Sequence, residues 1–220
     1  MKEYANRALL KIEGQIRITS TQAEIRYFLS HHISEFLKNH RRVTFDVEGG
    51  NRDYILTSIE SGDTDFGILN RDSVSKEFVY RDLFKTKFVL IASKNAHYTV
   101  EDLCTLGQIA TLPFISIPKS STLTPWIEKR FSQAGLKLNS VVILNNYENT
   151  KKYVGLGIGV SIIDDYMLTQ EDKEKLDVFP LDQFFKARRF GITLRKRKYL
   201  SPAVKTFLKT IMPGSPVDLF

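Results

Sequence analysis

The sequence predicts an α/β protein with parallel sheets, because strand-like and helix-like segments alternate along almost the whole chain of 220 residues. A hydrophobic content of 42% is enough for a core in one larger domain or in two smaller lobes. Apolar runs fall short of the roughly 18 residues that a transmembrane helix needs. The N-terminal stretch MKEYANRALLKIEGQ lacks the apolar core of a secretory signal. We therefore expect a cytoplasmic protein that makes no membrane contact.

The first expected elements are a helix end, a strand and a longer helix. Residues 1–13 have mixed helical spacing and are predicted to be the end of a linker helix, which Gly14 stops. Isoleucines alternate with polar residues over 15–18, which predicts a strand. Thr21, followed three residues later by Glu24, fits a capping box at the start of the next helix. The wide apolar stripe of that helix consists of Ile25, Phe28, Leu29, Ile33, Phe36 and Leu37.

The rest of the chain continues this alternation. Thr99 with Asp102 fits the start of a short helix. Thr124 followed by Pro125 fits the N-cap and first position of another helix. Strands are expected at 43–47, 65–69, 87–93, 113–117, 140–145, 159–163, 176–181 and 188–196. Further helices are expected to end at Gly62 and Gly135, to cover 148–156, and to begin at Ser201.

The net charge of +7 is concentrated in one segment, 186–198, which contains no acidic residue. Outside this segment, basic and acidic residues are equal in number, at 25 each. Such a cluster is typical of a surface that faces an anion or DNA. It equally fits a solvated strand end followed by a basic turn. The basic residues are Lys186, Arg188, Arg189, Arg195, Lys196, Arg197 and Lys198.

Several patterns that suggest cofactor, metal or catalytic chemistry fail on order or spacing. The glycines of 155–159 follow a helix and open a strand, which is the reverse of a dinucleotide fingerprint. The four histidines lack metal-ligand spacing, and Asp164 with Asp165 has no third acid nearby. Cys104, the single cysteine, lies in an apolar pattern and is predicted to be a small buried residue. No motif for an activated nucleophile is present, so we expect no cofactor, no metal and no enzymatic activity.

Polar side chains follow three of the predicted strands, just before a helix begins. Ligands bind beyond the carboxyl ends of strands in open α/β sheets, where helix N-termini offer free N–H groups and a partial positive charge. Hydroxyls and amides at these positions suit a small anion or a polar metabolite. The candidate ligand-binding residues are Thr19, Ser20, Thr21 and Gln22 after the first strand, Ser121 and Thr122 after the strand at 113, and Asn145 and Asn146 after the strand at 140.

Six stretches of residues 12–212 follow one another in a recognisable order and spacing. They are EGQIRITST near the start, ESGDTDFGIL at 60–69, DLFKTKFVLIAS at 82–93, LPFISI at 112–117, FSQAGL at 131–136 and KKYVGLGIGVSII at 151–163. Together they resemble the effector-binding domain of LysR-type transcriptional regulators. Within that family, STQA at 20–23 is most similar to the branch that controls sulfur assimilation and cysteine synthesis.

The resemblance implies particular ligand contacts. Thr21 and Gln22 would help to hold a sulfate-like anion, and Thr122 would supply a second contact. The third contact, usually a threonine in that branch, falls on Asn145, whose amide is both donor and acceptor. This departure leaves the effector open: a sulfate-like anion, an acetylserine-like compound and another organic acid are all candidates.

The resemblance also implies a two-lobed fold like that of type 2 periplasmic binding proteins, with the effector in a cleft between the lobes. Lobe I would comprise 14–84 and 196–213, lobe II 94–185, the crossing strands 85–93 and 186–195, and the tail 214–220. The family forms homodimers, or tetramers at full length. In the dimer, the helix at 23–38 of one chain lies near the helix at 125–134 of the other.

The expected function is ligand sensing for a regulator of transcription. The family binds DNA through an N-terminal winged helix, which this chain is expected to lack as a truncated part of a longer regulator. A small anionic or polar effector would favour one arrangement of the lobes and so change DNA binding. A solute-binding protein of a transporter and an enzyme on the same two-lobed fold are the alternatives.

Overall fold

The computed structural model describes residues 12–118 and 121–213, and the chain divides into two compact units. Unit 1 combines the chain up to Phe84 with the part from Arg189 onwards, and unit 2 comprises Lys85–Arg188. The predicted C-terminal tail and nearly all of the predicted linker helix lie outside the described residues.

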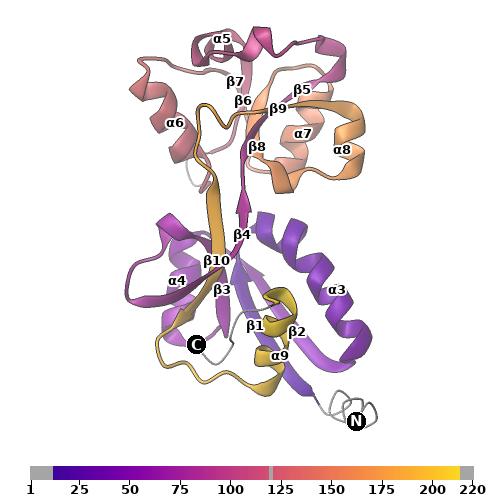
Figure 1. Ribbon diagram of the computed structural model, residues 1–220, viewed down its shortest axis with the longest axis vertical. Helices are drawn as coiled ribbons and strands as arrows, with labels where there is room; N and C mark the ends of the chain where they lie inside the picture. The colour runs from indigo at the N-terminus through magenta and orange to yellow at the C-terminus, as the bar shows by residue number, and fades with distance from the viewer. Residues whose placement is uncertain (1–11, 119–120, 214–220) are drawn as a thin grey trace. The chain divides into compact units, whose positions relative to one another are not determined.

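Unit 1 is built on a five-stranded mixed sheet (Figure 1). Its strands, in spatial order, are β2 (Arg42–Gly49), β1 (Glu13–Ser20), β3 (Phe66–Asn70), β10 (Arg188–Arg195) and β4 (Phe78–Thr86). β1 pairs in parallel with β2 and β3, whereas β10 pairs antiparallel with β3. The chain passes between the two units within β4 and within β10. The ends of β1, β2 and β3 that lead into the following helices and turns therefore lie at one edge of the sheet.

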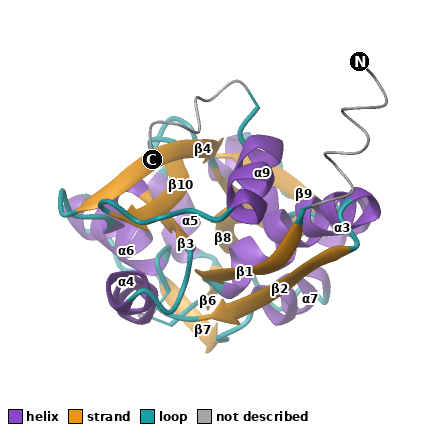
Figure 2. Ribbon diagram, turned by 90° about the horizontal axis from the view of Figure 1, so that it is seen from below, coloured by secondary structure: helices purple, strands orange, loops and turns teal. Residues whose placement is uncertain are grey.

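Helices cover both faces of the unit-1 sheet. They are α2 (Gln22–Glu24), a π-helical turn (Ile25–Leu29), α3 (Ser30–Asn39), α4 (Arg52–Ser61), a 3-10 turn (Arg71–Ser73) and α9 (Pro202–Ile211). The first three run on as one helix, as predicted. α9 packs against β1 and α3, while α4 contacts β1 and β3 from the other side (Figure 2). Phe36, Phe45 and Phe207 pack edge to face in the core, with ring centroids 5.0–5.9 Å apart.

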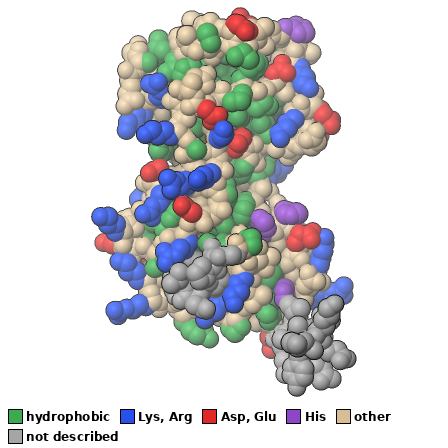
Figure 3. All heavy atoms as spheres, in the orientation of Figure 1, with side chains coloured by type: hydrophobic (Ala, Val, Ile, Leu, Met, Phe, Trp, Pro, Cys, Tyr) green, Lys and Arg blue, Asp and Glu red, His purple; other side chains and the backbone are tan. Residues whose placement is uncertain are grey.

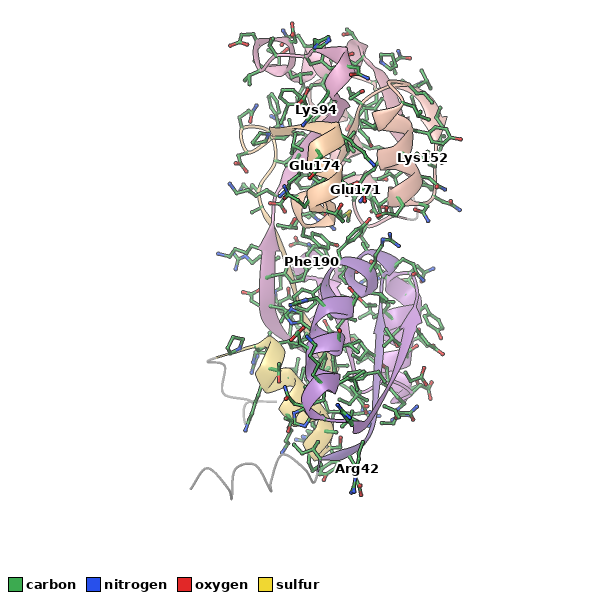
Figure 4. The ribbon with its side chains drawn as sticks, turned by 90° about the vertical axis from the view of Figure 1, so that its right-hand side faces the viewer. Arg42, Lys94, Lys152, Glu171, Glu174 and Phe190 are labelled. Atoms are coloured by element: carbon green, nitrogen blue, oxygen red, sulfur yellow. The ribbon has the colours of Figure 1, made fainter. Side chains whose placement is uncertain are left out.

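A second aromatic stack ties this long helix to the two crossing strands within unit 1. The ring of Phe28 stacks on Phe84 in β4 with centroids 4.8 Å apart. Phe84 in turn stacks on Phe190 in β10 at 5.2 Å, and Figure 4 labels Phe190 on this strand. A shift of either crossing strand would therefore change the ring contacts of the helix that begins at the end of β1.

Unit 2 contains a three-stranded antiparallel sheet and a two-stranded parallel sheet. The first consists of β8 (Ser161–Asp164), β5 (Phe88–Ser93) and β9 (Leu176–Pro180), and the second of β6 (Pro113–Ser116) and β7 (Asn139–Ile143). A parallel bridge between Phe114 and Val160 joins the two sheets. The helices are α5 (Leu106–Thr111), α6 (Thr124–Gln133), α7 (Tyr147–Gly155) and α8 (Gln170–Lys175), with 3-10 turns at Lys94–Ala96, Glu101–Leu103 and Asp165–Met167. β6 leads into α6, and β7 leads into α7.

The predicted α/β class is confirmed, but the sheets are mixed rather than parallel. β10 runs antiparallel to β3, and β5 runs antiparallel to both β8 and β9. Each of these pairs joins strands far apart in the sequence, so local alternation of strands and helices carries no information about their direction. β4 is missing from the predicted strands. It lies at a sheet edge with residues mostly half-buried on both faces, which removes the alternation that marks a strand.

Three local predictions were wrong. Gly14 does not end a helix but lies inside β1, with a φ of +124° that favours glycine. The N-cap of α6 is Leu123, and the hydroxyl of Thr124 donates to the carbonyl oxygen of Ile117 at 3.0 Å. Cys104 is exposed rather than buried, because the apolar run around it ends in a turn.

The helix expected at Thr99 is a 3-10 turn. Asp102 accepts hydrogen bonds from the backbone N–H and the hydroxyl of Thr99, both at 2.8 Å, and these bonds lower the pKa of Asp102. The regular helix begins later. Thr105 and Gln108 form the capping box of α5, which the sequence analysis missed.

Candidate functional site

Ser20 and Thr21 stand at the carboxyl end of β1, where the long helix begins. Ser20 is 0% exposed. Its hydroxyl lies 3.1 Å from the carbonyl oxygen of Ile68 in β3 and 3.4 Å from Oε2 of Glu24. Thr21 is half-buried and donates its hydroxyl to the same carboxylate oxygen of Glu24. Both predicted hydroxyls thus lie beside one carboxylate.

The predicted capping box of Thr21 and Glu24 does not form as expected. Thr21 is the N-cap residue in extended conformation, but its side chain makes no hydrogen bond to the backbone of the first turn. The hydroxyl of Thr21 instead donates a hydrogen bond to the carboxylate of Glu24. Glu24 is 1% exposed, and a carboxylate in the first turn is favoured by the helix dipole. This helix start therefore already holds a buried carboxyl group.

Gln22 extends from the first helical turn across the end of β2. A Cβ placed on Gly49 would stand 2.0 Å from Nε2 of Gln22, so a side chain at position 49 would displace that amide. Gly50 N–H donates to the carbonyl oxygen of Ser20 at 2.9 Å and holds the next loop against the end of β1. The ends of β1 and β2 therefore form one polar edge that carries the exposed amide of Gln22.

Asn70, at the carboxyl end of β3, adds a polar group that the sequence analysis missed. It is 2% exposed, and its Oδ1 accepts a hydrogen bond from the N–H of Asp72 at 3.0 Å. Its Nδ2 has no hydrogen-bond partner among the described residues. Ile68 is the register partner of Ser20, and alternate residues of a strand share a face. Asn70 therefore lies on the same face of the sheet as Ser20.

Thr19 does not join this edge, because neighbouring residues of a strand point to opposite faces. It lines a separate polar groove of about 350 Å³ between β1, β2 and α4, together with Asp46, Glu48 and Tyr54. The hydroxyl of Tyr54 donates to Glu48 at 2.5 Å, and this bond raises the pKa of Tyr54. The groove is thus distinct from the polar strand ends.

In unit 2, Ser121 links the loops that follow β6 and β7. Its Oγ lies 2.9 Å from the hydroxyl of Tyr147, the first residue of α7, and either group can donate. The same Oγ accepts a hydrogen bond from the N–H of Leu123 at 3.1 Å. Two of the predicted polar junctions are therefore brought together within this unit.

Thr122 accepts hydrogen bonds from a buried arginine at the start of β10. Nη2 of Arg188 donates to Oγ1 of Thr122 at 3.2 Å and to its carbonyl oxygen at 3.4 Å. Nη1 of Arg188 pairs with Asp164 at the end of β8, and the two side chains are 1% and 0% exposed. Because Oγ1 of Thr122 accepts from Arg188, its own proton remains available to a ligand. The predicted contact is thereby joined to a crossing strand.

Asn145 and Asn146 differ in their roles. Asn146 is the N-cap of α7, and its Oδ1 accepts from the N–H groups of Glu148 at 2.8 Å and Asn149 at 3.3 Å. Asn145 is exposed. Of the two predicted residues, Asn145 is therefore better placed to offer its amide to a ligand, while Asn146 holds the helix start.

The basic segment 186–198 does not act as one patch. Arg188 is buried in its ion pair. Arg195 and Lys198 donate to backbone carbonyls at the C-terminal end of α4, at 3.3 and 3.2 Å, where cations are favoured by the helix dipole. On the face drawn in Figure 3, basic side chains are scattered among acidic and neutral ones. This favours structural and solvated roles over a nucleic-acid surface.

Comparisons with known proteins agree with this geometry. The family described as LysR substrate binding domain matches residues 11–214. The chain belongs to this family. The HTH-type transcriptional activator CmpR of Synechocystis sp. is 26% identical over 197 residues, which are 89% of this chain and 64% of CmpR. Regulators named Cbl and CysB are also among the relatives of this LysR-type domain.

Solved structures show the same fold. The crystal structure of the cofactor-binding domain of the Cbl transcriptional regulator has a TM-score of 0.84 and 24% identity, and the match covers 96% of this chain and 92% of that one. The regulatory domain of CcmR from Synechocystis PCC6803 in complex with 2-PG has a TM-score of 0.78 and 20% identity, with coverage of 91% and 96%. The predicted two-lobed fold, similar to type 2 periplasmic binding proteins, is confirmed.

The LysR-type domain is shorter than the regulators it matches, since it spans 64% of CmpR. Among its described residues, none of the helices has the length and apolar character needed to cross a membrane. The same residues contain no group of three or more metal-ligating side chains.

Four residues of these clusters were not predicted as site residues, and their sequence signals differ in strength. Asn70 ends an apolar strand as a polar residue, which is the pattern that identified the other strand ends. Glu24 was noted only as a cap, since its burial is invisible in the sequence. Tyr147 and Arg188 interact with residues 26 and 66 positions away, and no local pattern reports such contacts.

Proposed function

We propose that this LysR-type domain senses a small effector on behalf of a transcriptional regulator, and that strand-end residues of both units bind that effector. The proposal rests on the hydroxyl and amide groups gathered at the carboxyl end of the unit-1 sheet, where Ser20, Thr21, Gln22 and Asn70 lie on neighbouring strands or just beyond them. Ligands of open α/β sheets bind at such ends.

The unit-2 part of the proposed site consists of Thr122 and Asn145. Thr122 keeps a hydroxyl proton for a ligand, and Asn145 exposes its amide. We propose supporting roles for Ser121, which bonds to Tyr147, and for Asn146, which caps α7. Thr19 is left out of the proposed site because it lines the separate groove on the other face.

The proposed effector is a small anionic or polar metabolite. The CcmR regulatory domain bound to 2-PG supports a small molecule as the type of ligand. A sulfate-like anion, an acetylserine-like compound and another organic acid remain the candidates, because Asn145 replaces the threonine of the sulfur-assimilation branch. Catalysis is not part of the proposal, since the strand ends offer mainly hydroxyls and amides and no motif for an activated nucleophile is present.

Effector binding would act on the crossing strands. Arg188 joins Thr122 to the start of β10, and within unit 1 the stack of Phe28, Phe84 and Phe190 joins β4 and β10 to the long helix. A ligand changes such an arrangement only by binding one form better than another. We propose that this preference alters DNA binding by the full-length regulator, in the cytoplasm, through a separate DNA-binding domain.

We further propose a homodimer. On the edge strand β7, Val141 and Ile143 are 48% and 67% exposed, beside an apolar groove of about 370 Å³ between β7 and α6. On the long helix, Ile25 and Ile33 of the predicted stripe are only half-buried. The family resemblance implies a side-by-side dimer in which the helix at 23–38 of one chain lies near the helix at 125–134 of the other, and sedimentation at several protein concentrations tests the assembly.

The site assignment is tested by combining Thr21→Ala with Thr122→Ala. A thermal-shift screen of sulfate, thiosulfate, acetylserine and small organic acids first identifies a ligand that raises the melting temperature with concentration. Loss of two hydroxyl hydrogen bonds should weaken that ligand about tenfold or more in calorimetry. The control combines Thr210→Ala on α9 with Thr111→Ala on α5, both exposed, and should bind like the wild type. Equal affinity in the site variant and the control refutes the assignment.

A further inference from the structure

Unit 2 contains a second groove, on the other side of α6 from the apolar groove beside β7. We call it the α6 groove. Its volume is about 470 Å³, which is within the range of small-molecule sites. Its lining comes from α6 and from the segment 184–186 that precedes β10, and it shares no lining residue with the apolar groove.

One face of α6 supplies an aromatic ring, two cations and an amide to this groove. Residues three, four and seven positions apart lie on the same side of a helix. The lining residues with this spacing are Trp126, Lys129, Arg130 and Gln133. Trp126 is half-buried and is the single tryptophan of the chain, so a large ring stands in the groove with part of its surface open to solvent.

The opposite wall of the α6 groove is held in place by the core of unit 2. Phe185 is 7% exposed, and its ring stacks on Phe88 in β5 with centroids 4.5 Å apart. Phe184 is fixed through its backbone, because its carbonyl oxygen accepts a hydrogen bond from Nε of Arg130 at 2.9 Å. The same bond orients the guanidinium of Arg130. The groove is therefore preformed.

The α6 groove is positively charged. Among the described residues that line it, none is acidic and three are cationic. The three are Lys129, Arg130 and Lys186. Within the described part of the chain, none of them pairs with a carboxylate. The neighbouring acids lie elsewhere, since Glu128 lines the apolar groove and Asp182 pairs with Lys87 at 2.9 Å. Figure 3 shows basic side chains over α6.

This combination of rings and cations matches a ligand that combines a planar ring with an anionic group. Aromatic side chains stack on planar rings, and a guanidinium donates to phosphate or carboxylate oxygens in a fixed geometry. Basic side chains alone are common on the surface of a chain with a net charge of +7. Here they surround a preformed aromatic groove, which also accommodates the apolar part of a ligand.

We propose that the α6 groove is a second small-molecule site, which binds a planar ring that bears a phosphate or carboxylate group. The ring stacks on Trp126, and the anionic group lies against Lys129, Arg130 and Lys186. This inference stands independently of the proposed effector site, because no residue of that site is among the described residues that line the α6 groove.

The test titrates the chain with AMP, adenosine and ribose 5-phosphate, followed by calorimetry and by tryptophan fluorescence. The fluorescence reports on the groove directly, because Trp126 is the only tryptophan. Adenosine lacks the phosphate of AMP, and ribose 5-phosphate lacks its ring. AMP should change the fluorescence and should bind about tenfold more tightly than either of the other two.

Benzoate distinguishes the two sources of the anionic group, because it carries a carboxylate on a planar ring. Benzoate binding that is weaker than AMP binding assigns the groove to phosphates, and tighter binding assigns it to carboxylates. Either result supports the inference if the variants of the groove weaken the bound probe.

Two variants locate the bound probe. Lys129→Gln with Lys186→Gln removes two of the three cations and should weaken AMP about tenfold. The matched control, Lys94→Gln with Lys152→Gln, makes the same change in net charge at two exposed lysines of unit 2 outside the groove, both labelled in Figure 4, and should bind like the wild type. Trp126→Leu removes the ring and should weaken AMP about tenfold in calorimetry, with ribose 5-phosphate unchanged.

Three results overturn the inference. The first is that neither AMP nor benzoate binds, or that both bind the wild type, the groove variants and the control equally. The second is that ribose 5-phosphate binds as tightly as AMP, because the ring then has no role. The third is that Thr21→Ala with Thr122→Ala abolishes AMP binding, because the probe then occupies the proposed effector site. Each of these results leaves the test of the effector site itself unchanged.

Discussion

Replacing Arg188 by Met should destabilise the chain far more than the same change at the next residue. The guanidinium of Arg188 is paired with Asp164, and the two side chains are 1% and 0% exposed. The substitution keeps an apolar stem but leaves the charge of Asp164 buried without this partner, which typically costs about 3–5 kcal/mol. It also removes the donors to Thr122. Most domains have only about 5–15 kcal/mol of stability in total, so the loss is large.

Arg189→Met is the matched control. Arg189 pairs with Asp82 at 3.6 Å, but both side chains are more than half exposed, at 57% and 56%. Such a pair contributes about 0–1 kcal/mol. Urea unfolding of both variants measures the difference. A double variant with Asp164→Asn should recover part of the loss, because it removes the stranded charge. If Arg188→Met is no more destabilising than Arg189→Met, the buried ion pair does not stabilise unit 2.

Two further outcomes follow from the structure. Gly49→Ala should displace the side chain of Gln22, whose Nε2 would lie 2.0 Å from the new Cβ, and should weaken effector binding in calorimetry. Gly107→Ala, where the nearest side-chain atom is 3.8 Å away, should not. Burial raises the pKa of Asp172, but the hydrogen bonds from Lys151 and Thr169 lower it by more, so the net pKa lies below the ordinary 3.8. Ionised Asp172 therefore stabilises the folded chain at pH values above its ordinary pKa. This stabilisation is lost as the pH falls through the lowered pKa. Melting temperatures at about pH 6 and about pH 3 should fall more steeply for the wild type than for Asp172→Asn, and parallel curves would contradict this assignment.

The sequence predicted what depends on local pattern. Alternating isoleucines identified β1, the apolar stripe identified the long helix, and Ser201 with Pro202 marked the start of α9, where Ser201 Oγ accepts from the N–H of Val204 at 3.3 Å. The polar strand ends were also visible, because hydroxyls and amides interrupt apolar runs at each of them. The family resemblance then supplied the two-lobed fold.

Long-range contacts explain what the sequence could not predict. Arg188 was counted with a basic cluster, yet its partner Asp164 is 24 positions away and both are buried. The separation of Thr19 from Ser20 depends on which face of β1 packs against α4. Glu24 fitted a capping box by spacing, but its carboxylate instead accepts the hydroxyl proton of Thr21. In each case the burial or the direction of a side chain determines its partners, and neither can be predicted from a short stretch of sequence.

The most direct test is a crystal structure of this chain with the effector that the thermal-shift screen identifies. Ligand density should contact Thr21 and Gln22 of unit 1 and Thr122 and Asn145 of unit 2. Density for the ligand elsewhere, for example in the groove lined by Thr19, with these four residues left uncontacted, would contradict it.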